Sequence, residues 1–213
     1  MPATDSAPLS FRPAAAADAA AAVPLIYSSG PAAFDYVFAH DRAGLALEFL
    51  HAAFEAGAGE FGHRNHVVGV RDGQVVATGA AWDGGVALRF TVAAAAQILR
   101  FYGWRRAAGV IARGLRVEGL IRPPRADEYY LAHLGVREGL RGRGIGASLV
   151  RQLLAGADPG RHRIAALDVA VTNPRAEALY ARLGFGVEVL RRSSLANRFH
   201  AVADHRRMSR ALP

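Results

Sequence analysis

The segment LRGRGIGASL, residues 140–149, has the composition of a loop that binds phosphate. Its glycines and arginines are Arg141, Gly142, Arg143, Gly144 and Gly146. An apolar pattern typical of a helix follows directly. The first N–H groups of a helix have no partner within it, and the helix dipole is positive there, so such a terminus attracts anions. Glycines let a ligand approach the backbone closely, and arginines add positive charge.

Two nucleotide-binding motifs compete for this loop. The P-loop requires G-x-x-x-x-G-K-[ST], and the chain contains no lysine, so that motif is excluded. The dinucleotide fingerprint G-x-G-x-x-A is matched by Gly142, Gly144 and Ala147, with Asp168 where a ribose-binding acid would lie. However, REGLR separates these glycines from the preceding strand, and the chain lacks a succession of βαβ units. A nicotinamide-dependent oxidoreductase stays as an alternative.

A third motif, R/Q-x-x-G-x-G/A before a helix, is matched by Arg141, Gly144 and Gly146. Further along, NPRAEALYARLGF fits the pattern N-x-x-A-x-x-L-Y-x-x-x-G-F. On these two motifs the sequence resembles the GNAT superfamily of acyl-CoA-dependent N-acetyltransferases, over at least residues 128–186. The resemblance implies an α/β fold with a mixed, mostly antiparallel, twisted sheet of about seven strands and helices on both faces. It also implies a V-shaped gap between the fourth and fifth strands.

The resemblance implies acetyl-CoA as cosubstrate and an amine acceptor that attacks it directly in a ternary complex. The pantetheine arm would pair in the gap like an added strand, and a backbone N–H near Leu134 would polarise the thioester carbonyl. Gly135 is expected to mark a β-bulge. The expected cosubstrate-binding residues are Leu134, Gly135, Val136, Arg141, Gly142, Arg143, Gly144, Ile145, Gly146, Ala147, Asn173, Ala176 and Tyr180.

Tyr180 is implied to protonate the departing thiolate, and it shares a helix face with Asn173, which is also a good helix cap. A general base must take a proton from the acceptor ammonium. His133 and Glu128, on the fourth strand, are the candidates, and an imidazole titrates near neutrality. Asp168 is a charge within an apolar strand. Each of these three also fits a structural role: a hydrogen-bonded histidine, an exposed strand-end acid and a paired acid.

Two further clusters have simpler interpretations. Asp35 and Tyr36 are expected in a loop that closes over the acceptor and selects it. His63 and His66 lie near a hairpin without an evident third ligand, so we interpret them as surface residues and expect no metal.

The apolar periodicities and turn residues predict the order of elements. We expect strands at 9–13, 128–136, 162–171, 185–193 and 200–212, a hairpin at 65–82 around Asp72–Gly73, and helices at 14–27, 42–57, 144–156 and 173–184. A loop is expected at 28–36. Residues 86–118 predict two helices separated near Gly103. A disordered tail over 1–8 and one acetyltransferase domain over 9–213, with a helical insertion at 86–125, complete the expectation.

The composition limits the partners. The formal charge is +8, but the arginines are scattered and do not alternate with aromatic residues, so we expect no nucleic-acid partner. A non-catalytic CoA-binding or nucleic-acid-binding domain is the remaining alternative. There are no cysteines, which excludes disulfides and agrees with a cytoplasmic location. No apolar run is long enough to span a bilayer, so no membrane association is expected. The acceptor is a small-molecule or peptide amine, and a homodimer is expected only because symmetric dimers are common.

Overall fold

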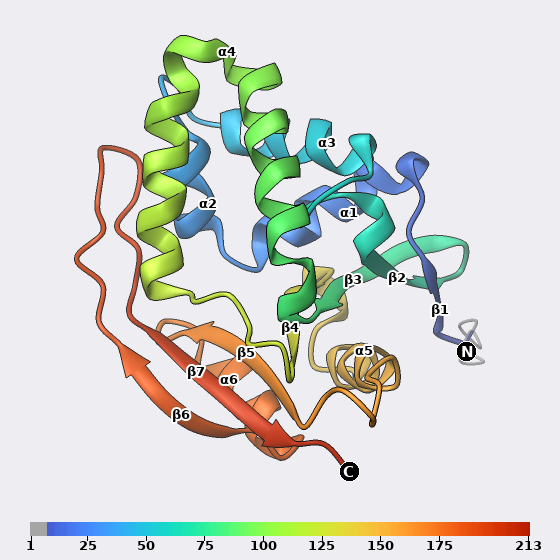
Figure 1. The fold of residues 1–213 in the computed structure, drawn as a ribbon. Coiled ribbons are helices and arrows are strands. Elements are labelled where there is room, and N and C mark those ends of the chain that lie inside the picture. The colour runs from blue at the N-terminus through green and yellow to red at the C-terminus, as the bar shows by residue number, and fades with distance from the viewer. Residues whose placement is uncertain (1–7) are drawn as a thin grey trace.

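The computed structural model describes residues 8–213, which form a seven-stranded sheet in the order β1-β2-β3-β4-β5-β7-β6 (Figure 1). Among the described strands only β4 and β5 pair in parallel, so the sheet is mixed and mostly antiparallel, as expected. The strands are β1 (Ser10–Pro13), β2 (His66–Arg71), β3 (Gln74–Trp82), β4 (Glu128–Val136), β5 (Ile164–Ala170), β6 (Gly186–Arg191) and β7 (His205–Ala211).

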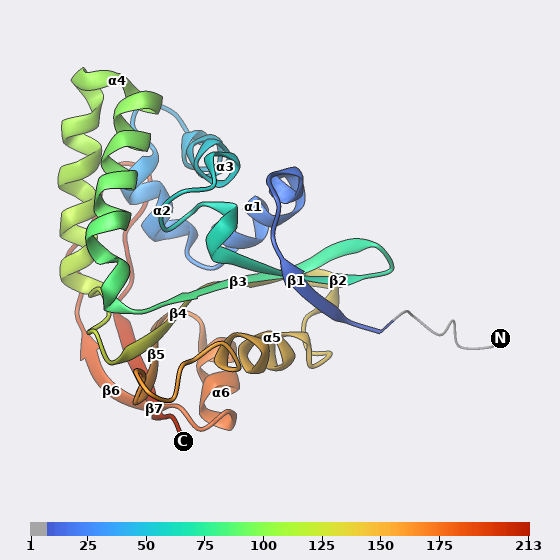
Figure 2. The same cartoon turned by 45° about the vertical axis from the view of Figure 1, so that its right-hand side comes forward.

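Helices cover both faces of the sheet (Figure 2). One face carries α1 (Ala19–Ser28), α2 (Pro31–Phe38), α3 (Leu45–Ala56) and α4 (Ala87–Leu120), and the other carries α5 (Ile145–Leu154) and α6 (Pro174–Arg182). The hairpin turn is as predicted, because Asp72 and Gly73 both have positive φ, 51° and 71°. No helix of residues 8–213 is long and apolar enough to cross a membrane.

The predicted loop at 28–36 is wrong, because α2 begins within it. Pro31 occupies the first turn of that helix, where its missing N–H costs nothing, and Gly30 precedes it. A proline after Ser-Ser-Gly is typical of a turn as well as of a helix start, so the local pattern does not distinguish the two. The tail predicted over 1–8 falls on residues 1–7, which lie outside the described part, and on Pro8.

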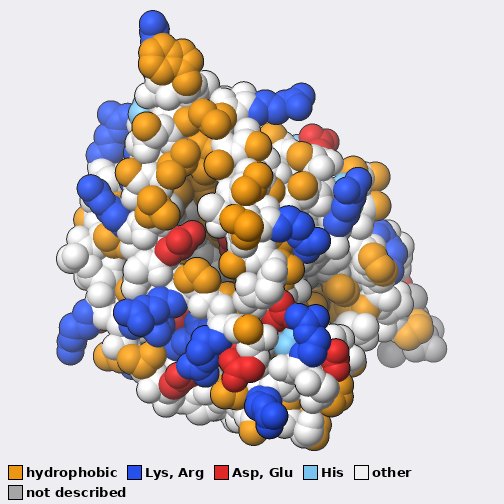
Figure 3. Space-filling view, in the orientation of Figure 1, with side chains coloured by type: hydrophobic (Ala, Val, Ile, Leu, Met, Phe, Trp, Pro, Cys, Tyr) orange, Lys and Arg blue, Asp and Glu red, His pale blue; other side chains and the backbone are white. Residues whose placement is uncertain are grey.

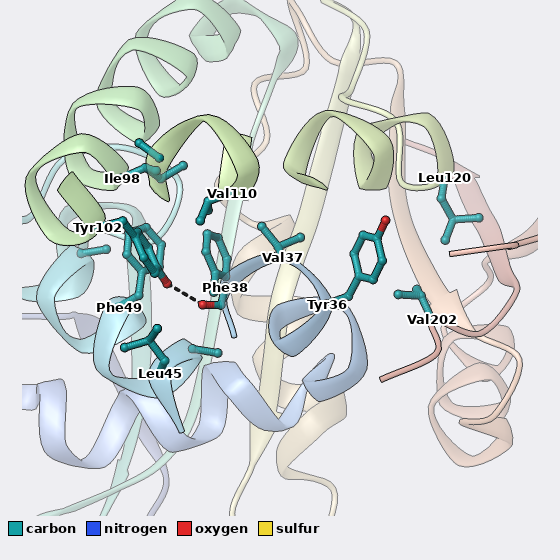
Figure 4. Close-up of a cluster of buried hydrophobic side chains, with 13 residues drawn as sticks. Tyr36, Val37, Phe38, Leu45, Phe49, Ile98, Tyr102, Val110, Leu120 and Val202 are labelled. Carbon is teal, nitrogen blue, oxygen red and sulfur yellow. Dashed lines mark hydrogen bonds between the residues drawn. The ribbon is translucent and has the colours of Figure 1, made fainter. Parts of the chain in front are cut away.

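The helical insertion forms two arms that join at Gly103, whose φ of 70° and ψ of 161° interrupt α4 as predicted (Figure 1). The arms pack on α2 through a cluster of buried side chains (Figure 4). The Tyr102 hydroxyl donates to the carbonyl of Phe38 at 2.8 Å, and Arg113 donates to the carbonyl of Val37 at 2.9 Å. The outer surface around α4 is rich in hydrophobic side chains and has basic groups at its margins (Figure 3). The large exposed hydrophobic residues of α4 include Leu88, Val92, Leu99, Trp104 and Leu115.

Strands β4 and β5 pair over only three residues, from Glu128–Ile164 to Tyr130–Ala166. Beyond Tyr130, β4 stays paired with β3, whereas β5 stays paired with β7. The sheet therefore opens between β4 and β5, which is the expected V-shaped gap. Within residues 8–213, the edge of β4 from 131 to 136 has no strand partner on that side.

The bulge in β4 lies earlier than predicted. Thr78 of β3 pairs with Gly135, whereas Ala80 pairs with Ala132, so both His133 and Leu134 face Gly79. Gly135 is glycine for another reason: a Cβ there would lie 2.2 Å from the carbonyl oxygen of Leu25 in α1. The glycine at 135 therefore reflects the close approach of α1 and not a bulge, and a contact of this kind cannot be seen in the sequence.

Candidate active site

The loop before α5 offers an open backbone surface. Gly142 and Gly144 have φ of 77° and 80°, in the left-handed region that favours glycine, and apart from their chain neighbours no residue of 8–213 comes within 4 Å of where their Cβ atoms would be. Gly144 is also the N-cap of α5. The Arg141 Nε donates to the carbonyl of Val136 at 3.0 Å, while Arg143 helps to line a hollow beside the loop.

The start of α5, the end of β4 and helix α6 meet at Gly146. A Cβ on Gly146 would lie 3.1 Å from Leu179 Cδ2 and 3.8 Å from Val136 Cγ2. Most of the predicted cosubstrate residues, namely 134–136, 141–147, Ala176 and Tyr180, thus belong to three neighbouring elements. The structure confirms that Asn173 caps α6, because its Oδ1 accepts from the Ala176 N–H at 3.2 Å.

The phenol of Tyr180 is buried. Its hydroxyl forms no hydrogen bond with any side chain or backbone group of residues 8–213. Its ring lies 6.3 Å from that of Phe185, and its exposed fraction is 8%. Burial raises the pKa of Tyr180 to about 12. The phenol therefore stays protonated at neutral pH, which is the state that an acid needs.

His133 stands at the bulge with a φ of 55°, an unusual conformation for a residue other than glycine. Backbone strain of this kind persists where the surroundings enforce it, and it is common at functional sites. The ring of His133 lies 5.1 Å from that of Phe61, 5.7 Å from Trp82 and 6.1 Å from Phe34. These aromatic rings hold the imidazole in one orientation.

Polar contacts extend from both nitrogens of this imidazole. Its Nδ1 is 3.1 Å from Nε2 of His66, and its Nε2 is 3.4 Å from Oε1 of Glu60. The other nitrogen of His66, Nδ1, donates to the carbonyl of Gly62 at 2.9 Å. The interpretation of His66 as a surface residue is wrong, since only 2% of it is exposed. His63, from the same pair, contacts the Phe54 carbonyl through Nδ1 at 2.9 Å.

Burial, and next the proximity of His133, lower the pKa of His66 to about 3. His66 is therefore neutral at ordinary pH. A second acid lies close by: Glu118, on α4, has a pKa raised by burial and by the charge of Glu60. No local pattern in the sequence connects Glu60 or Glu118 to His133, so sequence reasoning missed both.

Glu128 is a buried member of an ion-pair network and not an exposed strand-end acid. Its Oε2 accepts from Arg207 at 2.7 Å, and its Oε1 lies 3.0 Å from Arg125 Nη2. Arg207 also pairs with Asp168 at 2.9 Å, and Tyr130 donates to the same carboxylate oxygen at 3.0 Å. Arg207 thus ties β4 to β5 and β7 where the strands are still paired.

Asp168 is occupied by this network. Burial raises the pKa of Asp168, against the influence of Arg207. Its side chain is 1% exposed, so it cannot reach a ribose, and the single parallel strand pair does not suit a dinucleotide fold. The structure therefore argues against a nicotinamide-dependent oxidoreductase.

Asp35 and Tyr36 lie on α2 instead of in a loop. Asp35 accepts from the Tyr27 hydroxyl at 2.7 Å and lies 3.1 Å from His200 Nε2. The ring of Tyr36 is buried in the cluster between α2 and α4 (Figure 4). Among residues 8–213 no group of three or more histidines and acids could hold a metal ion.

Comparisons with known proteins agree with this geometry. The sequence profile of the Acetyltransferase (GNAT) family matches residues 34–185. An N-acetyltransferase from Staphylococcus aureus aligns with a TM-score of 0.64 at 16% identity, over 94% of this chain and 100% of that one. A putative acetyltransferase from Salmonella typhimurium with its cofactor acetyl-CoA gives 0.54 at 17% identity, over 97% and 95%.

A ribosomal-protein-S18-alanine N-acetyltransferase from Escherichia coli aligns with a TM-score of 0.52 at 15% identity, over 96% of this chain and 94% of that one. At these identities the structures show a shared fold. Comparison of the sequence with curated proteins gave no match.

Proposed function

Because the chain belongs to the acetyltransferase (GNAT) family, we propose that it transfers the acetyl group of acetyl-CoA to a primary amine, with residues 9–213 acting as one domain. One observation carries the proposal: β4 and β5 separate after Tyr130, and the edge of β4 left unpaired runs to Val136, which lies beside the glycine loop that opens α5. This leaves a strand edge for the amide groups of a pantetheine arm and a helix N-terminus for its pyrophosphate.

The residues present fit such a ligand. Backbone on the open side of Gly142 and Gly144 is free for close approach, since among the described residues only their chain neighbours come within 4 Å of their Cβ positions. Arg143 would add charge, and the edge of Leu134, Gly135 and Val136 would hold the arm. Bound there, acetyl-CoA supplies an acetyl thioester that an amine can attack.

Three groups of the protein would then act as oxyanion donor, general acid and general base. A backbone N–H near Leu134 donates a hydrogen bond to the thioester oxygen as negative charge develops on it. The Tyr180 phenol, still protonated because its pKa is about 12, gives its proton to the leaving sulfur. His133 takes the proton of the acceptor amine. Glu128 is left out of the chemistry, because Arg207 and Arg125 already neutralise its carboxylate.

Charge near His133 supports a cationic acceptor. Glu60, in the loop after α3, lies beside the imidazole of His133. Glu118, on α4, lies close enough to Glu60 for their charges to interact. A protonated amine would be attracted to this end of the site.

The first experiment compares thermal stability with acetyl-CoA, CoA, NADH and buffer. A ligand at 100 times its Kd adds about 2.7 kcal/mol to the free energy of unfolding. Stabilisation by acetyl-CoA and CoA, and not by NADH, is expected. No stabilisation by either CoA compound would refute the proposal.

Acetyl transfer is then measured by the release of the free CoA thiol. The acceptors tested are an alkyl diamine, an arylalkylamine and a peptide with a free N-terminal alanine. Acetylation of at least one is expected. Binding of CoA without transfer to any amine would favour the non-catalytic alternative.

A further inference from the structure

A chain of polar contacts links the backbone to the centre of the proposed site. It runs from the Gly62 carbonyl to His66, then to His133, and ends at Glu60. Both imidazoles are nearly inaccessible to solvent, with exposed fractions of 2% and 9%, and their rings lie 5.2 Å apart at an angle of 12°. Water therefore has little access to the contact between them.

The positions of the protons along this chain of contacts can be assigned from the Gly62 carbonyl, which can only accept. A carbonyl oxygen only accepts, so Nδ1 of His66 carries the proton in the contact with Gly62. A neutral imidazole carries a single N–H, so Nε2 of His66 is an acceptor. The contact from His66 Nε2 to His133 Nδ1 then requires a proton on His133 Nδ1. The neutral form of His133 consequently has its lone pair on Nε2, the nitrogen near Glu60.

We propose that His66 is a positioning residue, which locks neutral His133 in the tautomer with its proton on Nδ1, so that Nε2 takes the proton of the acceptor ammonium. This inference rests on the proposed acetyl transfer. In the step, an N–H bond of the ammonium breaks and its electron pair stays on nitrogen as the attacking lone pair. The proton goes to Nε2 of His133.

Glu60 completes the arrangement. Neutral His133 presents Nε2 and Glu60 presents Oε1 at a separation of 3.4 Å, and neither carries a proton to share. A primary ammonium can donate one N–H to each of them. After proton transfer, the carboxylate of Glu60 faces the new imidazolium and stabilises its charge.

The groups around the pair leave the assignment intact. His133 faces His66 from β2 and Glu60 from the loop after α3, while Phe34, Phe61 and Trp82 carry no charge. His66 faces His133, and His63 acts on it weakly from the adjoining turn. Glu118 of α4 acts on Glu60.

The tautomer can be read without substrate. Long-range ¹H–¹⁵N spectra of the full chain with ¹⁵N-labelled histidine distinguish protonated from unprotonated ring nitrogens. At alkaline pH we expect His133 to show a proton on Nδ1 and none on Nε2. The opposite tautomer in the parent protein would overturn the proposal, whatever the activity of the enzyme.

Two variants of His66 separate positioning from packing. In His66→Gln the amide oxygen can still accept from His133 Nδ1, whereas the ring of His66→Phe fills space but accepts nothing. We expect His66→Phe to lower kcat by at least about 10-fold, part of the 10²–10⁴-fold that a positioned base contributes, with the KM for acetyl-CoA unchanged. His66→Gln should restore most of the loss. The control is His63→Gln, in the same turn but outside the chain of contacts, which should keep the parent kcat.

The outcomes distinguish this inference from the proposed function. If the parent acetylates no amine, the proposed function fails, while the spectra still decide the tautomer. If the parent is active but folded His66→Phe turns over equally fast, or His66→Gln loses as much kcat as His66→Phe, then His66 does not act through His133.

Discussion

The burial of His66 predicts that the protein loses stability in mild acid. The pKa of this residue falls from 6.5 to about 3 on folding, because the protonated imidazole would be cut off from water and would face His133. Between these values the unfolded chain binds a proton that the folded protein does not bind. The free energy of unfolding therefore decreases as the pH falls below about 6.5.

The magnitude follows from the linkage relation. Lowering the pH from 8 to 5 is expected to cost about 2 kcal/mol through His66 alone. The result is insensitive to the folded value, because any pKa below about 4 gives nearly the same cost over this interval. His205, whose pKa is also lowered by burial, adds to the loss in the same direction.

The assay is urea unfolding of the parent and of His66→Gln at pH 8, 6.5 and 5, followed by circular dichroism. The variant starts from a lower stability, but its difference from the parent should shrink by about 2 kcal/mol between pH 8 and pH 5. His51→Gln, at a half-exposed histidine of α3, is the matched control and should follow the parent. A difference that stays constant with pH would refute the argument that His66 is buried and neutral.

Three further changes test the site. Tyr180→Phe should lower kcat by roughly 10²–10⁴-fold with little change in CoA affinity, and unchanged turnover would reject the acid role. Gly144→Ala, at a φ of 80° with open space around it, should weaken CoA binding measured by calorimetry, whereas Gly186→Ala in β6, also in open space but without positive φ, should not. Glu128→Gln breaks the buried ion pair with Arg207 and should lower the free energy of unfolding in urea by about 3–5 kcal/mol. The kcat of the folded variant should stay near that of the parent. A large loss of kcat without a loss of stability would instead support Glu128 as a base.

The local parts of the fold could be predicted because short-range chemistry determines them. The Asp72–Gly73 turn, the break of α4 at Gly103 and the Asn173 cap of α6 each depend on the conformational preferences of one or two residues. The glycine loop before α5 belongs to the same class, since its positive φ values and the helix start that follows depend on neighbouring residues alone. For this reason the positive φ of the loop glycines, the start of α5 and the Asn173 cap could be predicted from sequence.

Contacts between distant segments decided the rest. The proximity of Glu60, His66 and His133 depends on how β2, β3 and β4 pair and on the bulge at His133, and no spacing in the chain encodes it. Glu128 and Asp168 could be recognised as acids on strands, but only the approach of Arg207 from β7 shows that they are paired and buried. The sequence by itself determined where the backbone turns through positive φ and where helices begin and are capped, because those properties are local. Tertiary structure decided which titratable groups share low-dielectric space, and therefore which of them can move a proton.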